Sequence, residues 1–235
     1  MTLHILAAGA SKGLVLHLQS QFTQETGLTI DGFFNAVGAV KEKFLNGEAC
    51  DVLILTATQI AELTAQGLLV AGSAAPLGAV STGVAVPAGQ PIPDISSPAH
   101  LAAALLASQA VFVPDPYQST AGIHFMKILD KLGIQTAVLP HLKAFPNGAI
   151  AMRHLADSTE AHAIGSTQIT EIKYTSGLTL VGSLPPEFAL STVYSAAISA
   201  KATNQAAARH LVALLTGTST RTLRHDSGFE ALPGE

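Results

Sequence analysis

The stretch "AAGASKGLVLHLQSQF", residues 7–22, decides the fold because it passes directly from a strand into a helix. The run "LHILAAG", which ends in the turn, is short and apolar, as in a buried strand. One face of the following helix carries apolar residues at helical spacing, namely Leu14, Val15, Leu18 and Phe22. The same order recurs in "LTIDGFF" with "VGAVKEKFLNG", and in "DVLIL" with "TQIAELTAQG". Three strand–helix units in a row predict a parallel sheet with helices on its faces.

The turn inside that stretch holds Ser11 and Lys12, and the first turn of the helix has no acidic residue. Helix N-termini attract negative charge because their unpaired N–H groups carry partial positive charge. A lysine in this place indicates that the negative charge comes from outside the chain. We therefore expect the helix start to bind an anion, although Ser11 could also be a simple helix cap.

Two long strand patterns, "GAVSTGVAVPAG" and "EFALSTVYSAAIS", bracket a second group of strands and helices in the middle of the chain. A strand that leaves the first sheet and a strand that returns to it predict two lobes joined by two crossings. We expect an α/β protein in which residues 1–83 and 187–235 form lobe 1, and residues 84–186 form lobe 2. Each lobe is expected to be a mostly parallel sheet flanked by helices.

Composition narrows the class of protein. The 235 residues are 48% hydrophobic and 12% charged, which excludes disorder, and a net charge of −4 gives no reason to expect nucleic acid. No apolar run approaches the ~20 residues of a membrane span, so no membrane insertion is expected. No basic start or cleavage site precedes "LHILAAG". The sequence as written therefore predicts a cytoplasmic protein, or a periplasmic one whose leader has been removed.

The sequence does not indicate a nucleotide-binding site or a metal-binding site. It contains neither the phosphate-binding pattern G-x-x-x-x-G-K-[ST] nor G-x-G-x-x-G. The histidines show no metal-ligand spacing, so neither a metal nor a cofactor is expected. The single cysteine, Cys50, precedes an apolar strand and is expected to be a buried structural thiol.

Several segments spread over nearly the whole chain together resemble the molybdate-binding proteins of ABC importers, which have the type II periplasmic-binding-protein fold. These segments are "AAGAS", "NGEACDVLILTA", "PDPYQSTAGIHFMKIL", "NGAIAMRHLADSTEAHAIGST" and "LRHDSGFE". The resemblance implies a cleft between the lobes that holds a tetrahedral oxyanion. Its ligands would be serine hydroxyls, a tyrosine hydroxyl and N–H groups at helix starts. It also implies an ABC permease as partner, if the chain is exported.

The family's site carries over only in part. Its first serine is Ser11, and its alanine at the middle-lobe helix start is Ala121. Its valine at the next helix start falls at Gly148, where a backbone N–H would serve equally well. Its second serine and its tyrosine fall at Gly38 and Ile164, so two hydroxyl donors are lost.

Other polar and charged side chains near the predicted site could bind a ligand. Asn35 could supply an amide near Gly38, and Lys12, His124 and Arg153 would add positive charge. A carboxylate pairs well with such cations, so we expect an organic carboxylate or another anion larger than molybdate. The predicted ligand-binding set is Ser11, Lys12, Asn35, Gly38, Ser119, Thr120, Ala121, Asn147, Gly148 and Arg153.

Three functions stay open from the sequence. The first is a solute-binding protein that traps a small anion without chemistry. The second is an isomerase of an unsaturated polycarboxylate such as aconitate, with Lys12 or His124 as the candidate base. The third is a cytoplasmic anion sensor. Plainer interpretations also remain, in which Lys12 is a surface residue, His124 is packed and Arg153 forms an ion pair.

Overall fold

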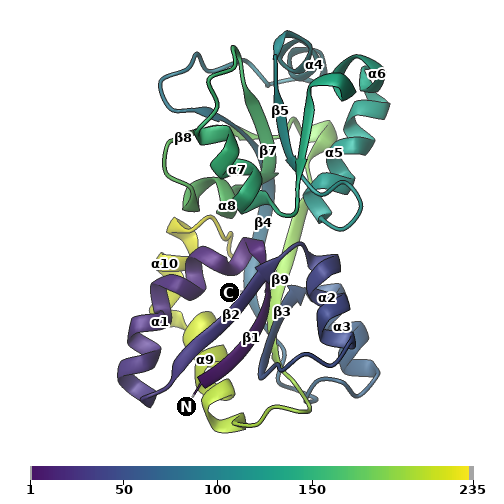
Figure 1. The fold of residues 1–235 in the computed structure, drawn as a ribbon. Coiled ribbons are helices and arrows are strands. Elements are labelled where there is room, and N and C mark those ends of the chain that lie inside the picture. Colours follow the sequence, from purple (N-terminus) through teal and green to yellow (C-terminus); the bar gives the residue numbers. More distant parts are fainter. Residues whose placement is uncertain (1, 233–235) are drawn as a thin grey trace. The chain divides into compact units, whose positions relative to one another are not determined.

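The computed structural model describes residues 2–232. The chain divides into two compact units: unit 1 is Met1–Val80 with Thr192–Glu235, and unit 2 is Ser81–Ser191. The chain passes between them within β4 (Ala75–Pro87) and at the start of β9 (Ser191–Ile198) (Figure 1).

The sheet of unit 1 has the strand order β2-β1-β3-β9. β1 (Thr2–Ala8) pairs in parallel with β2 (Thr29–Asn35) and with β3 (Val52–Thr56). β9 runs antiparallel to β3. The carboxyl ends of β1, β2 and β3 therefore meet at one edge, where α/β proteins commonly bind their ligands.

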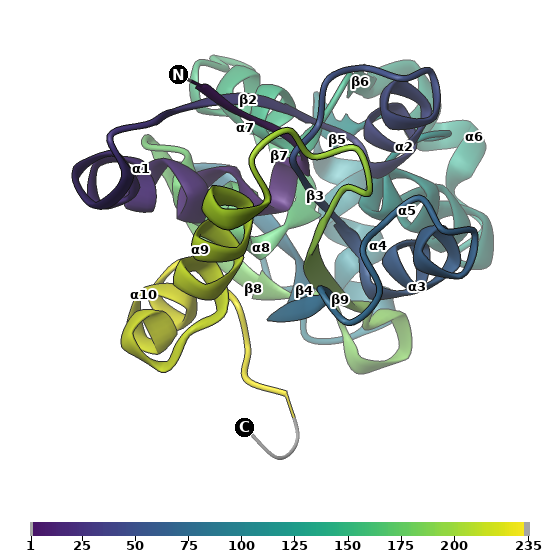
Figure 2. The ribbon, with the colours of Figure 1, turned by 90° about the horizontal axis from the view of Figure 1, so that it is seen from below.

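Helices cover both faces of this sheet (Figures 1 and 2). On one face α1 (Lys12–Thr26) packs against α9 (Gln205–Thr216), and on the other lie α2 (Val37–Leu45) and α3 (Ala57–Ala65). The four residues predicted for the apolar face of α1 are the ones that α1 buries. α1 ends before Gly27, whose left-handed φ of 70° suits glycine. The short α10 (Arg221–Asp226) follows η4 (Thr218–Thr220).

The sheet of unit 2 has the strand order β4-β7-β5-β6, and β8 also pairs with β4. β5 (Val111–Pro114) runs parallel to β6 (Leu142–Phe145) and β7 (Ile164–Gln168). β4 runs antiparallel to β7 and to β8 (Leu178–Ser183). The carboxyl ends of β5, β6 and β7 thus form a second edge at which helices begin.

Alternate side chains along β4 and β5 divide the core of unit 2 between two faces. Val84 and Val86 pack with α4 (Pro98–Ala107), α5 (Thr120–Lys131) and α6 (Gln135–Val138). Ala85 and Phe112 pack on the other side, with α7 (Gly148–Ala156) and α8 (Ile169–Tyr174). This alternation is the period of a strand that is buried on both faces.

Within residues 2–232, no helix is long and apolar enough to cross a membrane.

Candidate functional site

The start of α1 lies at the carboxyl end of β1 in unit 1. Ser11 is fully buried there, and its hydroxyl donates a hydrogen bond of 2.8 Å to the carbonyl of Ala8. Within residues 2–232 this hydroxyl makes no capping bond to an N–H group of α1. Ser11 is therefore not a simple side-chain cap of α1. The 3-10 turn Gly9–Ser11 leads directly into α1, and the N–H of Lys12, the first residue of α1, donates to the carbonyl of Gly9.

Residues 9–13, "GASKG", also fit G-x-S-x-G, the pattern of a hydrolase nucleophile between a strand and a helix. Such a nucleophile sits on a strained turn beside a histidine. Ser11 instead continues a right-handed helical turn (φ −92°, ψ −7°), and its hydroxyl is bonded to a backbone carbonyl. The geometry of Ser11 therefore does not resemble an activated nucleophile.

Two further helices of unit 1 begin at the same edge. The side chain of Asn35, at the end of β2, accepts the N–H of Ala36 at 2.9 Å, and Gly38 follows in the first turn of α2. Thr56, at the end of β3, caps α3 by accepting the N–H of Gln59. Tyr194 of β9 lies opposite Thr56 and is buried. Thr56 and Tyr194 reach this edge through strand pairing, which the sequence patterns did not reveal.

The start of α5 gives unit 2 a comparable feature. Ser119 precedes α5, is buried, and makes no capping bond within the described part of the chain. Gly122 in the first turn lies against the loop after β5, where an added Cβ would stand 2.2 Å from the carbonyl oxygen of Asp115. The carboxylate of Asp115 fixes the same loop by accepting the N–H groups of Tyr117 and Gln118. The start of α5 is thus held rigidly, and its first turn contains no acidic residue.

The start of α7 is different, because a carboxylate of the chain itself occupies it. Asn147 caps α7 by accepting the N–H of Ile150 at 2.9 Å. The N–H groups of Gly148 and Ala149 donate to the carboxylate of Glu171. An added Cβ on Gly148 would lie 1.9 Å from this carboxylate, so glycine is required by close packing. The predicted anion site at Asn147 and Gly148 therefore coincides with N–H groups that the protein already uses.

Glu171 itself is buried and carries several hydrogen bonds. Its carboxylate accepts the hydroxyl of Thr167 at 2.6 Å and the N–H of Gln168. Burial outweighs these bonds and raises the pKa of Glu171 to about 7. A buried acid in a short helix leaves no distinctive pattern in the sequence, so Glu171 was not predicted as a site residue.

The three predicted positively charged residues, Lys12, Arg153 and His124, differ in their burial and in their position on the helices. Lys12 is half-buried at the first position of α1, and Arg153 is exposed in the last turn of α7, at the far end from Gly148. His124 places Nε2 2.8 Å from the carbonyl oxygen of Phe188. Because a carbonyl only accepts, Nε2 carries a proton, and only Nδ1 of His124 could act as a base.

Gln168 lies at the carboxyl end of β7 and was not predicted as a site residue from the sequence. Ile164, which the family resemblance places at the tyrosine position, lies at the opposite end of β7 in an apolar core. Gln168 is buried, as are Thr82 and Thr170. Within residues 2–232, both amide atoms of Gln168 and the two threonine hydroxyls are without a hydrogen-bond partner.

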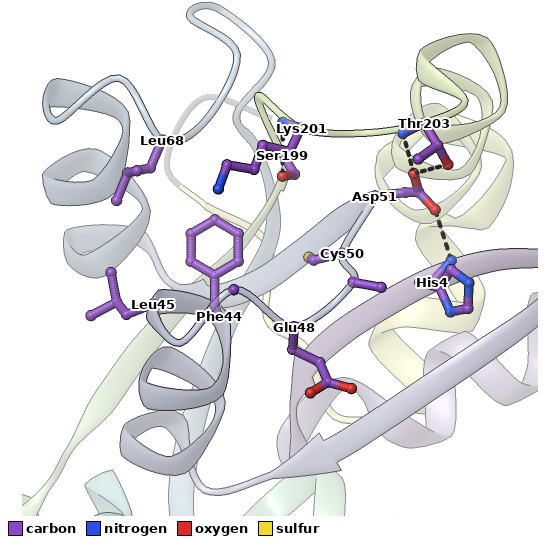
Figure 3. A pocket seen from close by; sticks show the side chains of 12 residues that line it. His4, Phe44, Leu45, Glu48, Cys50, Asp51, Leu68, Ser199, Lys201 and Thr203 are labelled. Carbon is purple, nitrogen blue, oxygen red and sulfur yellow. Dashed lines mark hydrogen bonds between the residues drawn. The ribbon is translucent and has the colours of Figure 1, made fainter.

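A cavity of about 170 Å³ lies in unit 1 at the amino ends of β1 and β3 (Figure 3). Beside it, the carboxylate of Asp51 accepts the N–H of His4 at 2.9 Å and the N–H of Thr203 at 2.7 Å. Cys50 is buried, as predicted, and burial raises the pKa of its thiol to about 12. Because this cavity is at the end opposite to the helix starts, we assign it to packing.

Among the described residues, no group of three or more histidine, cysteine, aspartate and glutamate side chains is placed to hold a metal ion.

The fold is that of the periplasmic binding proteins. The periplasmic molybdate-binding protein of Azotobacter vinelandii has a TM-score of 0.80 and 18% identity, over 98% of this chain and 99% of that one. The sulfate-binding protein SubI of Mycobacterium tuberculosis has a TM-score of 0.72 and 16% identity, over 100% and 88%. The expected fold class is thereby confirmed.

The chain belongs to the family of bacterial extracellular solute-binding proteins, whose model matches residues 3–230. A curated relative, the aconitate isomerase of a Pseudomonas species, is 26% identical over 245 residues. That alignment covers 100% of this chain and 89% of the isomerase. The resemblance to molybdate-binding proteins is thus confirmed at the level of family and fold.

Proposed function

We propose that this protein is a solute-binding protein for a small anion, and that helix starts of the kind found at Ser11 and Ser119 receive the anion. The observation that carries the proposal is the pair of helix starts at Ser11 and Ser119. Each serine is buried, precedes a helix of at least twelve residues whose first turn has no acidic residue, and makes no side-chain cap to that helix in the described structure. Uncapped helix starts without acidic residues favour an anionic ligand.

The ligand is proposed to be an organic carboxylate or another anion larger than molybdate. In unit 1, Lys12 begins α1 and would pair with a carboxylate. In unit 2, the N–H groups at the start of α5 can receive anionic oxygens. Gly38 and Ile164 replace two hydroxyl donors that a tetrahedral-ion cage would use. Membership of the family supports delivery of the ligand to an ABC permease, and hence a periplasmic location.

Calorimetry with molybdate, sulfate, citrate and aconitate tests this proposal. Ser119→Ala is expected to weaken binding about tenfold, since it removes a hydroxyl donor at a helix start. Ser11→Ala is expected to do the same if the Ser11 hydroxyl turns from the carbonyl of Ala8 to the ligand. Ser97→Ala is the matched control, because Ser97 caps α4 by accepting the N–H of His100 and lies outside the proposed site. Equal affinities for all three variants and the parent protein would place the site elsewhere.

A second candidate function is the isomerisation of an unsaturated polycarboxylate. The observation in its favour is the alignment of the whole chain with the Pseudomonas aconitate isomerase. In this case Lys12, or Nδ1 of His124, would move a proton next to a substrate carboxylate. Incubation of cis-aconitate with the protein, followed by NMR, distinguishes the two functions. Conversion that is lost in Lys12→Ala or His124→Ala would establish an enzyme, and unchanged substrate would favour a receptor.

A further inference from the structure

Four buried polar atoms of unit 2, on β4, on β7 and at the start of α8, have no hydrogen-bond partner within the described residues. They are Nε2 and Oε1 of Gln168 and the hydroxyls of Thr82 and Thr170, and none has a hydrogen bond within residues 2–232. The three residues are only 3%, 1% and 4% exposed. Buried polar groups are nearly always paired because an unmade bond costs free energy. These atoms therefore indicate a partner that does not belong to the chain.

Strand pairing places two of these residues on one face of the sheet. Thr82 of β4 lies directly opposite Gln168 of β7, and directly opposed residues of antiparallel strands point to the same side. Val84 and Ile164, an even number of residues away along the same strands, pack in the core that includes α5. The side chains of Thr82 and Gln168 thus lie on the face that α5 covers.

The position along the strand is equally informative. Gln168 is the last residue of β7, and β5, which pairs with β7 in parallel, leads into the loop before α5. The carboxyl end of β7 and the start of α5 are therefore at the same edge of unit 2 (Figure 1). An uncapped helix start and an unpartnered buried amide are two independent signs of a ligand at this edge.

The surroundings hold these groups firmly. The N–H of Thr82 donates to the carbonyl of Leu190 at 2.9 Å, and the carbonyl of Thr82 accepts the N–H of Leu184 at 3.2 Å. Nε2 of His124 binds the carbonyl of Phe188 in the same returning segment. His124 thereby connects α5 to residues 184–190, the segment whose backbone also binds Thr82. These bonds favour a preorganised site.

The chemistry of an amide restricts what can bind. Whichever way the Gln168 amide is turned, one end donates and the other only accepts. A carboxylate or an oxyanion can satisfy the donor but not the acceptor. A hydroxyl satisfies both, because it donates to Oε1 and accepts from Nε2.

We propose that Gln168, assisted by Thr82, binds a hydroxyl group of the ligand, and that the ligand is a hydroxylated organic acid. This inference rests on the proposed function, in which the start of α5 receives a carboxylate of the same ligand. The amide then recognises a group that inorganic oxyanions, when fully ionised, do not have.

Two pairs of acids that differ by one hydroxyl test the inference by calorimetry. Citrate is compared with tricarballylate, and malate with succinate. In at least one pair, the hydroxy acid is expected to bind at least ten times more tightly than the acid without the hydroxyl. Without that hydroxyl, the buried groups of Gln168 stay unpaired. Gln168→Met, which keeps the length of the side chain, is expected to abolish that preference while the hydroxyl-free acid binds as before.

The outcomes separate this inference from the proposed function. Equal affinity within both pairs, or equal losses for both acids in Gln168→Met, would overturn the hydroxyl assignment and leave anion binding intact. If no organic acid binds the parent protein while Ser11→Ala weakens molybdate or sulfate binding, anion binding also stands and only the hydroxy acid is wrong. If no anion binds at all, both proposals fail.

A ligand-free measurement checks whether the groups are truly unpaired. Thr82→Val removes an unpartnered hydroxyl and is expected to raise the melting temperature by about 2–4 °C. Thr220→Val is the matched control, because the buried Thr220 hydroxyl donates to the carbonyl of Leu214 at 2.9 Å and accepts from Arg224. This control is expected to lower the melting temperature. A similar decrease for Thr82→Val would show that the hydroxyl is paired by bound water, and would contradict the ligand assignment.

Discussion

The hydroxyl of Thr167 donates a hydrogen bond of 2.6 Å to the carboxylate of Glu171, four residues later in the chain. The same carboxylate accepts the N–H groups of Gly148 and Ala149 at the start of α7. The start of α7 thus has a carboxylate of unit 2 itself, that of Glu171, on its N–H groups. The first turn of α5 has no acidic residue, and the nearby carboxylate of Asp115 accepts the N–H groups of Tyr117 and Gln118 in the preceding loop. This contrast favours α5 for the ligand.

The first prediction concerns the effect of pH on stability. Burial raises the pKa of Glu171 from 4.5 to about 7, so the folded state binds this proton more tightly than the unfolded state. The contribution of Glu171 to stability should be greatest below pH 4.5 and should fall as the pH rises to 7. The change corresponds to about 3 kcal/mol in the free energy of unfolding. Urea unfolding of the parent protein and of Glu171→Gln, from pH 4.5 to 8, measures it.

Glu171→Gln cannot titrate and should lack this part of the pH dependence. Its free energy of unfolding is expected to vary less with pH than that of the parent protein in the same interval. Two parallel curves would show that Glu171 keeps an ordinary pKa.

The second prediction concerns Gly148. An alanine Cβ there would lie 1.9 Å from the Glu171 carboxylate and 2.1 Å from the Thr167 hydroxyl. Gly148→Ala is expected to lower the free energy of unfolding by about 1–3 kcal/mol, as overpacking does. In the background of Glu171→Ala, which opens the space, the same substitution should cost less. Equal costs in the two backgrounds would mean that the carboxylate is not the obstacle.

The third prediction concerns Asp51, at the amino edge of unit 1. Its buried carboxylate accepts the N–H groups of His4 and Thr203 and the hydroxyl of Thr203 (Figure 3). Asp51→Ala leaves these donors unpaired and should lower the free energy of unfolding by about 2–4 kcal/mol. Asp51 lies at the opposite end of the strands from Ser11. The anion affinity of the variant, measured where the variant is fully folded, should therefore not change. A variant with normal stability and reduced affinity would contradict both statements.

The fourth prediction concerns Lys12. If it pairs with a ligand carboxylate, Lys12→Met should weaken binding of an organic acid about tenfold and reduce its dependence on salt. Lys41→Met is a suitable control, since Lys41 already pairs with Glu62 at 3.0 Å on the surface. Calorimetry at 50 and 300 mM salt compares the variants, and an unchanged salt slope in Lys12→Met would exclude the pairing.

Much of the fold follows from local patterns in the sequence. The apolar stripe of α1 and the strand–helix order of unit 1 were predictable because each depends on neighbours within about two helical turns. The turns at Ser11 and Ser119 were also predictable as helix starts without acids. The family resemblance added the fold class, because it draws on segments along the whole chain.

The remaining features depend on contacts between distant residues, and only the tertiary structure decided them. Glu171 reaches Gly148 from 23 positions later in the chain, and Thr82 meets Gln168 through the pairing of β4 with β7. Whether a polar group is buried, and whether its partner is present, depends on which strands are neighbours in the sheet. Sequence alone therefore determined where helices start, whereas strand pairing decided which starts are already occupied and left Gln168 buried without a partner in the described chain.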